Sequence, residues 1–223
     1  MSEESRSAAS RGDTTREALI QAAIEIFGRD GFAAAGTRAI SEAAGVNQAL
    51  IGYHFGGKPG LYNAALKSIA DSVMARMGPQ VEVIEAALAE DANAGSESRN
   101  ARPGGADAGR SLELLHGLTD AFVQMLTSDA SSAWARLILR EQQAPSEGFD
   151  ILYQGVMHRV LDVTTRLVAH VRRRAEADEK CKLTALTILG QALVFRAARA
   201  AAMREMRWTR FTQTEIEIGR AHV

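Results

Sequence analysis

The sequence predicts an all-α protein with a small N-terminal and a larger C-terminal helical domain. Only four of the 223 residues are proline and 5% are aromatic, whereas good helix formers such as alanine and leucine are frequent. Apolar residues recur at intervals of three and four positions, and they rarely alternate with polar residues as they do in a strand. Glycine-containing breaks divide the chain into segments of helical length.

Composition and charge exclude several classes of protein. The chain is 46% hydrophobic and 24% charged, unlike a disordered or collagen-like chain. Its single cysteine, Cys181, cannot form an internal disulfide or a multi-cysteine zinc site. The net charge of −1 argues against a protein that coats nucleic acid, although it is compatible with a small basic patch. Residues 1–12 lack the apolar core of a signal peptide and residues 183–195 are too few to span a bilayer, so we expect a cytoplasmic protein with no membrane partner.

In the first 60 residues the pattern predicts a disordered arm followed by three helices. The arm, residues 1–12, is small and polar. Thr14 and Glu17 match a capping box at the start of the first helix, and Gly31 ends that helix. The three helices are expected at residues 13–31, 37–44 and 47–55, with Thr37 and Asn47 capping the second and the third.

Beyond residue 55 the pattern predicts further helices separated by breaks. A fourth helix begins near Pro59, and the pair Gly78–Pro79 is expected to end it. Residues 91–110 are rich in Gly, Ser and Ala, which predicts a mobile loop. Further helices are expected near residues 81–88, 111–126, 131–143, 149–177 and 179–205, with a short last helix from residue 212.

Residues 37–62 are the most informative segment, because two short helices joined by a tight turn form a helix-turn-helix unit. Ala43 and Ala44 are small enough for the helices to cross closely, and Gly45 can adopt the positive φ of a sharp reversal. Ile40, Ala43 and Ala44 are expected on the inner side of the first short helix, and Val46 and Ile51 on the inner side of the second. The outer side of the second short helix then carries side chains that are polar or small enough to enter a major groove, namely Asn47, Gln48, Ala49, Tyr53 and His54.

This segment resembles the N-terminal domain of TetR-family transcriptional regulators over about residues 14–65. The matching features are Phe27 with Gly31, Thr37, Ile40, the turn Ala44-Gly45-Val46, the triplet Tyr53-His54-Phe55, Lys58 and Leu61. The resemblance implies a helix-turn-helix DNA-binding domain at residues 13–60 and a helical effector-binding and dimerisation domain at residues 61–223. Use of the motif for packing alone is the alternative.

The family pattern also implies contacts with the DNA backbone. Thr37 and Lys58 would touch phosphates, and Arg38 would reach a phosphate or a base. Residues 31–60 carry a net charge of only +1, so affinity would depend on few phosphate contacts in each subunit.

The pattern places base contacts on the second short helix. Gln48 and Ala49 would face base edges, where Gln48 can form two hydrogen bonds with adenine. Tyr53 and His54 would reach the backbone or a thymine methyl group, unless Tyr53 packs half-buried and His54 only braces the helix. Gly52 departs from the family pattern, in which an aromatic residue is common, so no relative's base preference can be transferred to this chain.

The region after Met77 contains no pattern typical of an enzyme. It lacks nucleophile-elbow, phosphate-loop and zinc-protease motifs. His116, His158 and His170 are too widely spaced to share one helical face within a turn or two. We therefore expect neither catalysis nor a cofactor or metal.

The two long C-terminal helices predict an interface between two copies of the chain. Their apolar faces exceed what one flank of a small bundle needs: Leu152, Val156, Met157, Val160, Leu161, Val163, Leu167, Val168 and Val171 on the first, and Leu183, Leu186, Leu189, Leu193, Ala197, Ala200 and Ala201 on the second. Such faces fit a two-fold four-helix interface, which the TetR resemblance also implies. Burial in the protomer's own core is the alternative.

An effector site is expected between these helices and those of residues 111–143. Apolar walls with a few polar anchors are typical of small-molecule sites, although the same side chains could be plain core. The candidate residues are Leu115, His116, Phe122, Met125, Trp134, Arg136, Leu137, Tyr153, Met157 and His158.

These features together predict a homodimer that binds double-stranded DNA at a palindromic operator, with half-sites about 34–36 Å apart or a multiple of that spacing. A repressor released by a small-molecule effector is the main interpretation. The alternatives are a DNA-binding activator or architectural protein without an effector, and a helical enzyme or interaction module.

Overall fold

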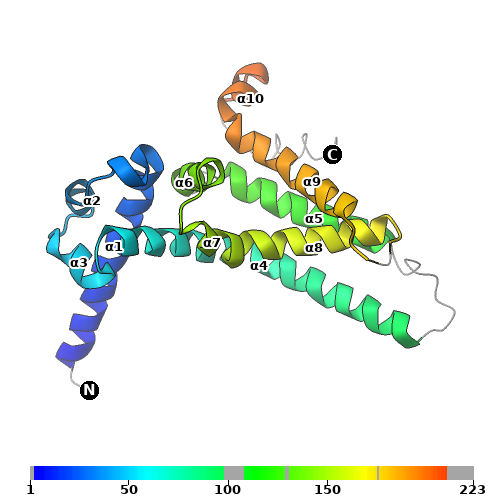
Figure 1. The fold of residues 1–223 in the computed structure, drawn as a ribbon, viewed down its shortest axis with the longest axis horizontal. Helices are drawn as coiled ribbons and strands as arrows, with labels where there is room; N and C mark the ends of the chain where they lie inside the picture. The colour runs from blue at the N-terminus through cyan, green and yellow to red at the C-terminus, as the bar shows by residue number, and fades with distance from the viewer. Residues whose placement is uncertain (1–2, 98–107, 129–130, 175, 210–223) are drawn as a thin grey trace. The chain divides into compact units, whose positions relative to one another are not determined.

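The computed structural model describes residues 3–97, 108–128, 131–174 and 176–209 (Figure 1). Within these ranges every regular element is helical, which confirms the all-α prediction. The elements are α1 (Glu3–Ala34), α2 (Thr37–Ala43), α3 (Ala49–Phe55), α4 (Lys58–Glu97), α5 (Ala108–Thr127), α6 (Ser132–Gln143), α7 (Phe149–Leu152), a π-helical turn (Tyr153–Met157), α8 (His158–Val171), α9 (Glu179–Ala197) and α10 (Arg199–Glu205).

The chain forms two compact units. Of the described residues, the first unit contains those within 1–72 and 132–155, and the second contains those within 73–131 and 156–223. The first unit therefore extends beyond the expected boundary at residue 60, and it includes α6 and α7, which we had expected in the effector domain. The reason is that α6 packs along α1.

The core of the first unit forms where α1 meets α2, α4 and α6. Phe27 is fully buried, and its ring meets the ring of Tyr62 edge-on at a centroid distance of 4.9 Å. Gly28 allows α1 and α6 to approach closely, because a Cβ there would lie 3.1 Å from the carbonyl oxygen of Ala133. Burial of Leu19, Ala23, Leu61, Leu66 and Leu137 completes this core.

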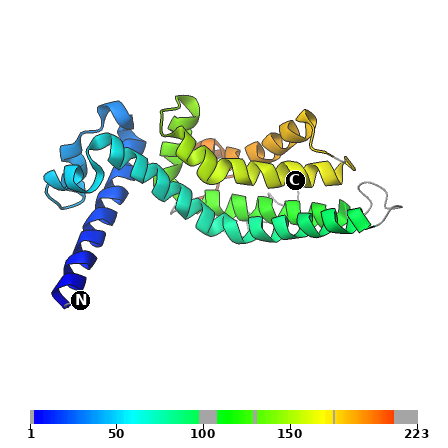
Figure 2. The ribbon, with the colours of Figure 1, turned by 60° about the horizontal axis from the view of Figure 1, so that its bottom comes forward.

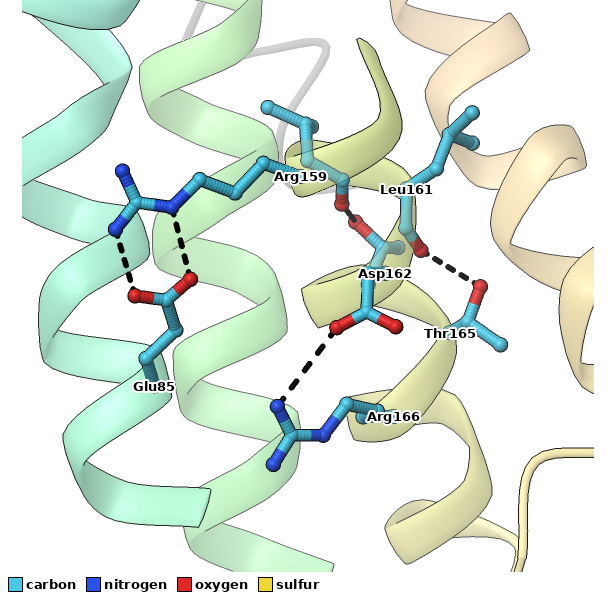
Figure 3. Close-up of polar contacts among 8 residues, drawn as sticks. Glu85, Arg159, Leu161, Asp162, Thr165 and Arg166 are labelled. Atoms are coloured by element: carbon cyan, nitrogen blue, oxygen red, sulfur yellow. Dashed lines mark hydrogen bonds and ion pairs between the residues drawn. The ribbon is translucent and has the colours of Figure 1, made fainter. Parts of the chain in front are cut away.

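In the second unit α5, α8 and α9 pack against one another, beside the part of α4 that belongs to this unit (Figures 1 and 2). The side of α8 that faces α4 is polar. Arg159 donates two hydrogen bonds to the carboxylate of Glu85, at 2.9 and 2.6 Å, and these bonds lower the pKa of Glu85 (Figure 3). On α8 itself, Arg166 lies 3.7 Å from Asp162 (Figure 3).

Two expectations for the N-terminal half are wrong. Helix α1 begins at Glu3 instead of near Thr14, because the segment expected as a disordered arm lacks proline and contains helix-favouring alanines. Helix α4 continues through the expected break at Gly78–Pro79. Proline removes one backbone hydrogen bond, but buried Met77 and Val81 hold the helix on either side of it.

The later boundaries also differ in part. Helix α4 extends to Glu97, so residues 91–97 are helical instead of belonging to a loop, and residues 98–107 lie outside the described ranges. The helical run from Phe149 ends at Val171 instead of near residue 177, and the last expected helix, from residue 212, also lies outside those ranges. Across the described residues no single helix is long and apolar enough to span a membrane. Only the bent pair Glu179–Val194 and Arg199–Glu205, taken together, reaches the necessary length and apolar composition.

Candidate nucleic-acid interface

The turn between α2 and α3 has the geometry that the sequence predicts. Gly45 has a φ of +67°, and its N–H donates to the carbonyl oxygen of Glu42 at 3.1 Å. The next N–H, of Val46, donates to the carbonyl oxygen of Ser41 at 3.0 Å. Ile40 and Ile51 are buried on the inner sides of the two helices, as expected.

Ala43 does not lie on the inner side of α2 as expected, because its side chain is exposed. The covered residues of α2 and its C-cap are Ile40, Ser41 and, partly, Thr37 and Ala44. At 100° per residue, Ala43 lies roughly 110° from the centre of that face. The close crossing of the two helices therefore depends on Ala44 and the Gly45 turn, and not on Ala43.

The outer side of α3 is open to solvent. Gln48 and Ala49 are exposed, and Tyr53, at 82% exposure, is the most exposed large hydrophobic side chain of the described residues. His54 is half-buried, and its ring meets the ring of Tyr53 nearly perpendicularly at 5.0 Å. Asn47 is used locally, since its Oδ1 accepts a hydrogen bond from the backbone N–H of Ala49 at 2.8 Å. This bond holds the first N–H of α3, although the N-cap position itself is Gln48. The expected cap of the second helix is wrong, because Thr37 is the first residue of α2 and Gly36 occupies the N-cap position.

Two polar contacts order the exposed side chains of α2. The Nε2 of Gln48 donates to the Oγ1 of Thr37 at 2.8 Å, which links the start of α3 to the start of α2. Arg38 pairs with Glu42 one turn later at 2.8 Å, and this hydrogen bond raises the pKa of Arg38. The Arg38 side chain is 83% exposed. The cation therefore stays at the surface, where an acidic partner already balances it.

Lys58, the first residue of α4, is held beside α1. Its Nζ donates to the carbonyl oxygen of Ala33 at 3.2 Å and lies 4.9 Å from the centre of the Phe32 ring. The start of α4 also packs tightly on the end of α3, because a Cβ on Gly60 would collide with the carbonyl group of Phe55. The contact between Lys58 and Phe32 was not foreseen from the sequence. The close approach of α4 to α3 did have a signal in the sequence, namely the run Gly-Gly-Lys-Pro-Gly at residues 56–60.

A buried polar network supports the interface from within the first unit, and sequence reasoning missed it. Glu141 on α6 is 2% exposed and accepts hydrogen bonds from the hydroxyl of Tyr62 and from the N–H and hydroxyl of Ser146. Arg140 donates to the carbonyl oxygens of Gly28 and Arg29, at 3.0 and 2.7 Å, where α1 nears its Gly31 kink. These contacts join α6 to α1 and α4, and α1 and α4 in turn support the helix-turn-helix pair α2 and α3.

The ten candidate effector residues are divided between the two units. Trp134, Arg136, Leu137 and Tyr153 belong to the first unit. The other six belong to the second unit and lie on elements that include the packed pair α5 and α8: Leu115, His116, Phe122 and Met125 on α5, Met157 at the end of the π-helical turn, and His158 as the first residue of α8. In the described parts of the chain no cluster of three or more His, Cys, Asp or Glu side chains could hold a metal ion.

The two apolar faces that were expected at an interface between copies of the chain differ in how far the protomer buries them. On α8, Val160, Val163 and Leu167 are buried within the protomer, which favours ordinary core for this part of its apolar face. On α9, four of the large apolar side chains on the outer face are exposed: Leu183 (58%), Leu186 (52%), Leu193 (37%) and Val194 (53%). We call these four side chains the α9 stripe.

Comparison with known families shows what kind of protein has this interface. Residues 19–65 match the family described as bacterial regulatory proteins, tetR family, and residues 112–222 match the C-terminal domain of the HTH-type transcriptional dual regulator CecR. The chain belongs to the TetR family of transcriptional regulators. As a TetR-family protein it is a DNA-binding regulator of transcription with a helix-turn-helix reading domain.

Two individual transcriptional regulators are similar to this chain. CecR of Shigella flexneri is 28% identical over 208 residues, which are 93% of this chain and 87% of CecR. The HTH-type transcriptional regulatory protein RaaS of Mycobacterium tuberculosis is 52% identical over 62 residues, 27% of this chain and 29% of RaaS.

Solved structures share the fold. A candidate TetR-family regulator of Mesorhizobium loti MAFF303099 has a TM-score of 0.52 at 18% identity, with 95% of this chain and 92% of that chain covered. A candidate transcriptional regulator of Pseudomonas aeruginosa PAO1 has a TM-score of 0.58 at 17% identity, with 92% and 86% covered.

Proposed function

We propose that this TetR-family protein is a cytoplasmic, non-enzymatic, homodimeric repressor that binds a palindromic operator and releases it when a small molecule binds. The observation that carries the proposal is the open outer side of α3, with exposed Gln48 and Ala49 beside a Tyr53 that is 82% exposed. A ring this exposed adds little to the protein's own packing, whereas a major groove accepts a helix with such side chains.

The proposed base contacts come from Gln48 and Ala49, with Asn47 beside them. Tyr53 and His54 would contact the DNA backbone or a thymine methyl group. The proposed phosphate contacts come from Thr37, Arg38 and Lys58, all of which lie near the ends of α2 and α4. To reach DNA, Arg38 must share or release Glu42, a small cost because exposed ion pairs contribute at most about 1 kcal/mol.

The homodimer is proposed to form through the α9 stripe. Leu183, Leu186, Leu193 and Val194 recur at spacings of three, seven and one along α9, so they line one side of the helix. Gly190 lies among them, and a Cβ there would meet nothing within 4 Å, so space remains for an approaching helix. A second copy of the same helix is a suitable partner, since a two-fold interface buries the same face on both protomers and matches a palindromic operator.

The effector is proposed to bind in the second unit, at the helices α5 and α8. Leu115 and Met125 are buried there, and Phe122 and Met157 are half-buried, which provides an apolar wall. His116 and His158 are exposed and could anchor a polar group of the ligand. The effector can release DNA only if it binds one arrangement of the dimer more tightly than the other.

Selection of bound duplexes from a random pool tests this proposal. A single palindromic sequence with half-sites about 34–36 Å apart, or a multiple of that spacing, is the expected result. Selection of no sequence, or of an asymmetric site bound by one protomer, would contradict it.

Two further assays test regulation. A reporter placed behind the selected operator should rise when the gene for this protein is deleted. CecR is named a dual regulator, so activation at some promoters is the second candidate, and a reporter that falls on deletion would favour it. A thermal-shift screen of small molecules should find a compound that stabilises the protein and releases the operator, and the absence of any such compound would favour a regulator without an effector.

A further inference from the structure

The hydrogen bond between Thr37 and Gln48 determines which atoms of the Gln48 amide remain available. The Nε2 of Gln48 donates one of its two N–H groups to the Oγ1 of Thr37, at 2.8 Å. Neither side chain makes another hydrogen bond in the described part of the chain. The exposed Gln48 amide therefore keeps one N–H donor and its Oε1 acceptor, and Thr37 keeps its own hydroxyl proton.

With the N–H that points away from Oε1 bound to Thr37, the other N–H lies beside Oε1, and one donor beside one acceptor is the pattern that adenine complements in the major groove. Adenine presents the N7 acceptor and the N6 amino donor, so a single amide can form both bonds. Guanine presents two acceptors, N7 and O6, and would need both N–H groups of the amide. Since Thr37 already occupies one of those N–H groups, pairing with guanine would require this bond to break.

We propose that Thr37 is a positioning residue for base recognition, which orients the Gln48 amide so that it prefers adenine over guanine. This inference rests on the proposed operator contact of α3. Because the Thr37 hydroxyl can donate its proton to a phosphate while its oxygen accepts from Gln48, one side chain connects the DNA backbone to the base contact. The position of the backbone and the choice of base are then coupled through a single oxygen atom.

The test measures base preference as well as affinity. Binding to the selected operator is followed by fluorescence anisotropy, with each base pair of a half-site replaced in turn. Wild type should prefer adenine over guanine by roughly 5- to 150-fold at the base pair that Gln48 contacts, the range expected for one amide pair. Gln48→Ala identifies that base pair, because it should remove the preference there alone.

Thr37→Val removes the hydroxyl at nearly constant volume. We expect it to weaken binding to all duplexes and, in addition, to lower the adenine-to-guanine ratio several-fold at the Gln48 base pair only. Thr37→Ser keeps the hydroxyl and should keep the ratio. Thr119→Val, which deletes a hydroxyl of the second unit, is the matched control and should change neither quantity. In a Gln48→Ala background, Thr37→Val should no longer alter any ratio.

The possible failures are distinguishable. If Thr37→Val weakens all duplexes equally and the adenine preference persists, the inference is overturned while the proposed operator binding stands. The same holds if Gln48→Ala changes preference at no base pair. If wild-type protein selects no duplex at all, the proposed function and the inference fall together.

Discussion

The buried Glu141 network of the first unit should contribute measurably to stability. Tyr62→Phe deletes the hydroxyl that donates to Glu141 and leaves the ring in place against Phe27. A hydrogen bond to a charged group contributes about 1.5–3 kcal/mol, and Tyr62 is only 5% exposed, so water cannot readily replace the missing partner. We therefore expect Tyr62→Phe to lower the free energy of unfolding by about 2 kcal/mol, which corresponds to a melting temperature lower by roughly 4–8 °C.

Glu141→Ala should lower the free energy of unfolding at least as much, because it removes the acceptor of both Tyr62 and Ser146. The two changes should not add. The double variant should show a coupling energy of about 1–2 kcal/mol, within the usual range for side chains in one hydrogen-bond network. Tyr53→Phe is the matched control, since it deletes the hydroxyl of a tyrosine that is 82% exposed and should leave stability unchanged.

Urea unfolding followed by tryptophan fluorescence is the suitable assay. The chain has two tryptophans, and Trp134 is buried on α6 in the first unit. A Trp208→Phe background leaves Trp134 as the single reporter of the unit that contains the network. Additive losses for Tyr62→Phe and Glu141→Ala, or a loss no greater than that of Tyr53→Phe, would refute the reasoning.

Three further predictions follow from the same structure. Lys58→Ala should weaken binding to operator and random DNA alike, and it should reduce the salt dependence of the binding constant by about 1 for each phosphate that the variant no longer touches. Gln48→Ala should weaken binding to the operator far more than binding to random DNA. Anisotropy titrations at several salt concentrations measure both effects. Leu186→Glu should shift the protein from dimer to monomer in analytical ultracentrifugation, while the matched Leu112→Glu on α5, which is 42% exposed in the protomer, should not. Burial and the bond to Glu141 raise the pKa of Tyr62, so the folded state holds that proton more tightly than the unfolded chain does. Stability should therefore fall as the pH rises above about 10, and Tyr62→Phe should remove this part of the fall in alkaline urea titrations.

Local conformational rules predicted the turn between α2 and α3 and the start of α3 well. The turn at Gly45 and the hydrogen bond from Asn47 to the start of α3 depend on the backbone and side chain of one or two residues, so they can be deduced from neighbours in the sequence. The same rules failed at Pro79 and at residues 91–97. There the long, buried side of α4 stabilises a helix that local composition alone would not favour.

Contacts between distant residues could not be predicted. Tyr62 and Glu141 are 79 positions apart, and nothing in either neighbourhood indicates the other. The apolar faces of α8 and α9 look equivalent as sequence patterns, yet Val163 is fully buried while Leu186 is 52% exposed. Which face is covered depends on the helices packed against it, and periodicity does not contain that information.

Gly52 lies in the middle of α3, and a Cβ built there would meet nothing within 4 Å. The fold therefore accepts other residues at this position without repacking, and alanine would strengthen the short helix by about 1 kcal/mol. Because the position is exposed on the reading helix, a side chain added there would alter the surface offered to DNA and leave the scaffold intact. Descendants of this protein could thus acquire new target sequences by a single change at residue 52, with no loss of folding to compensate elsewhere.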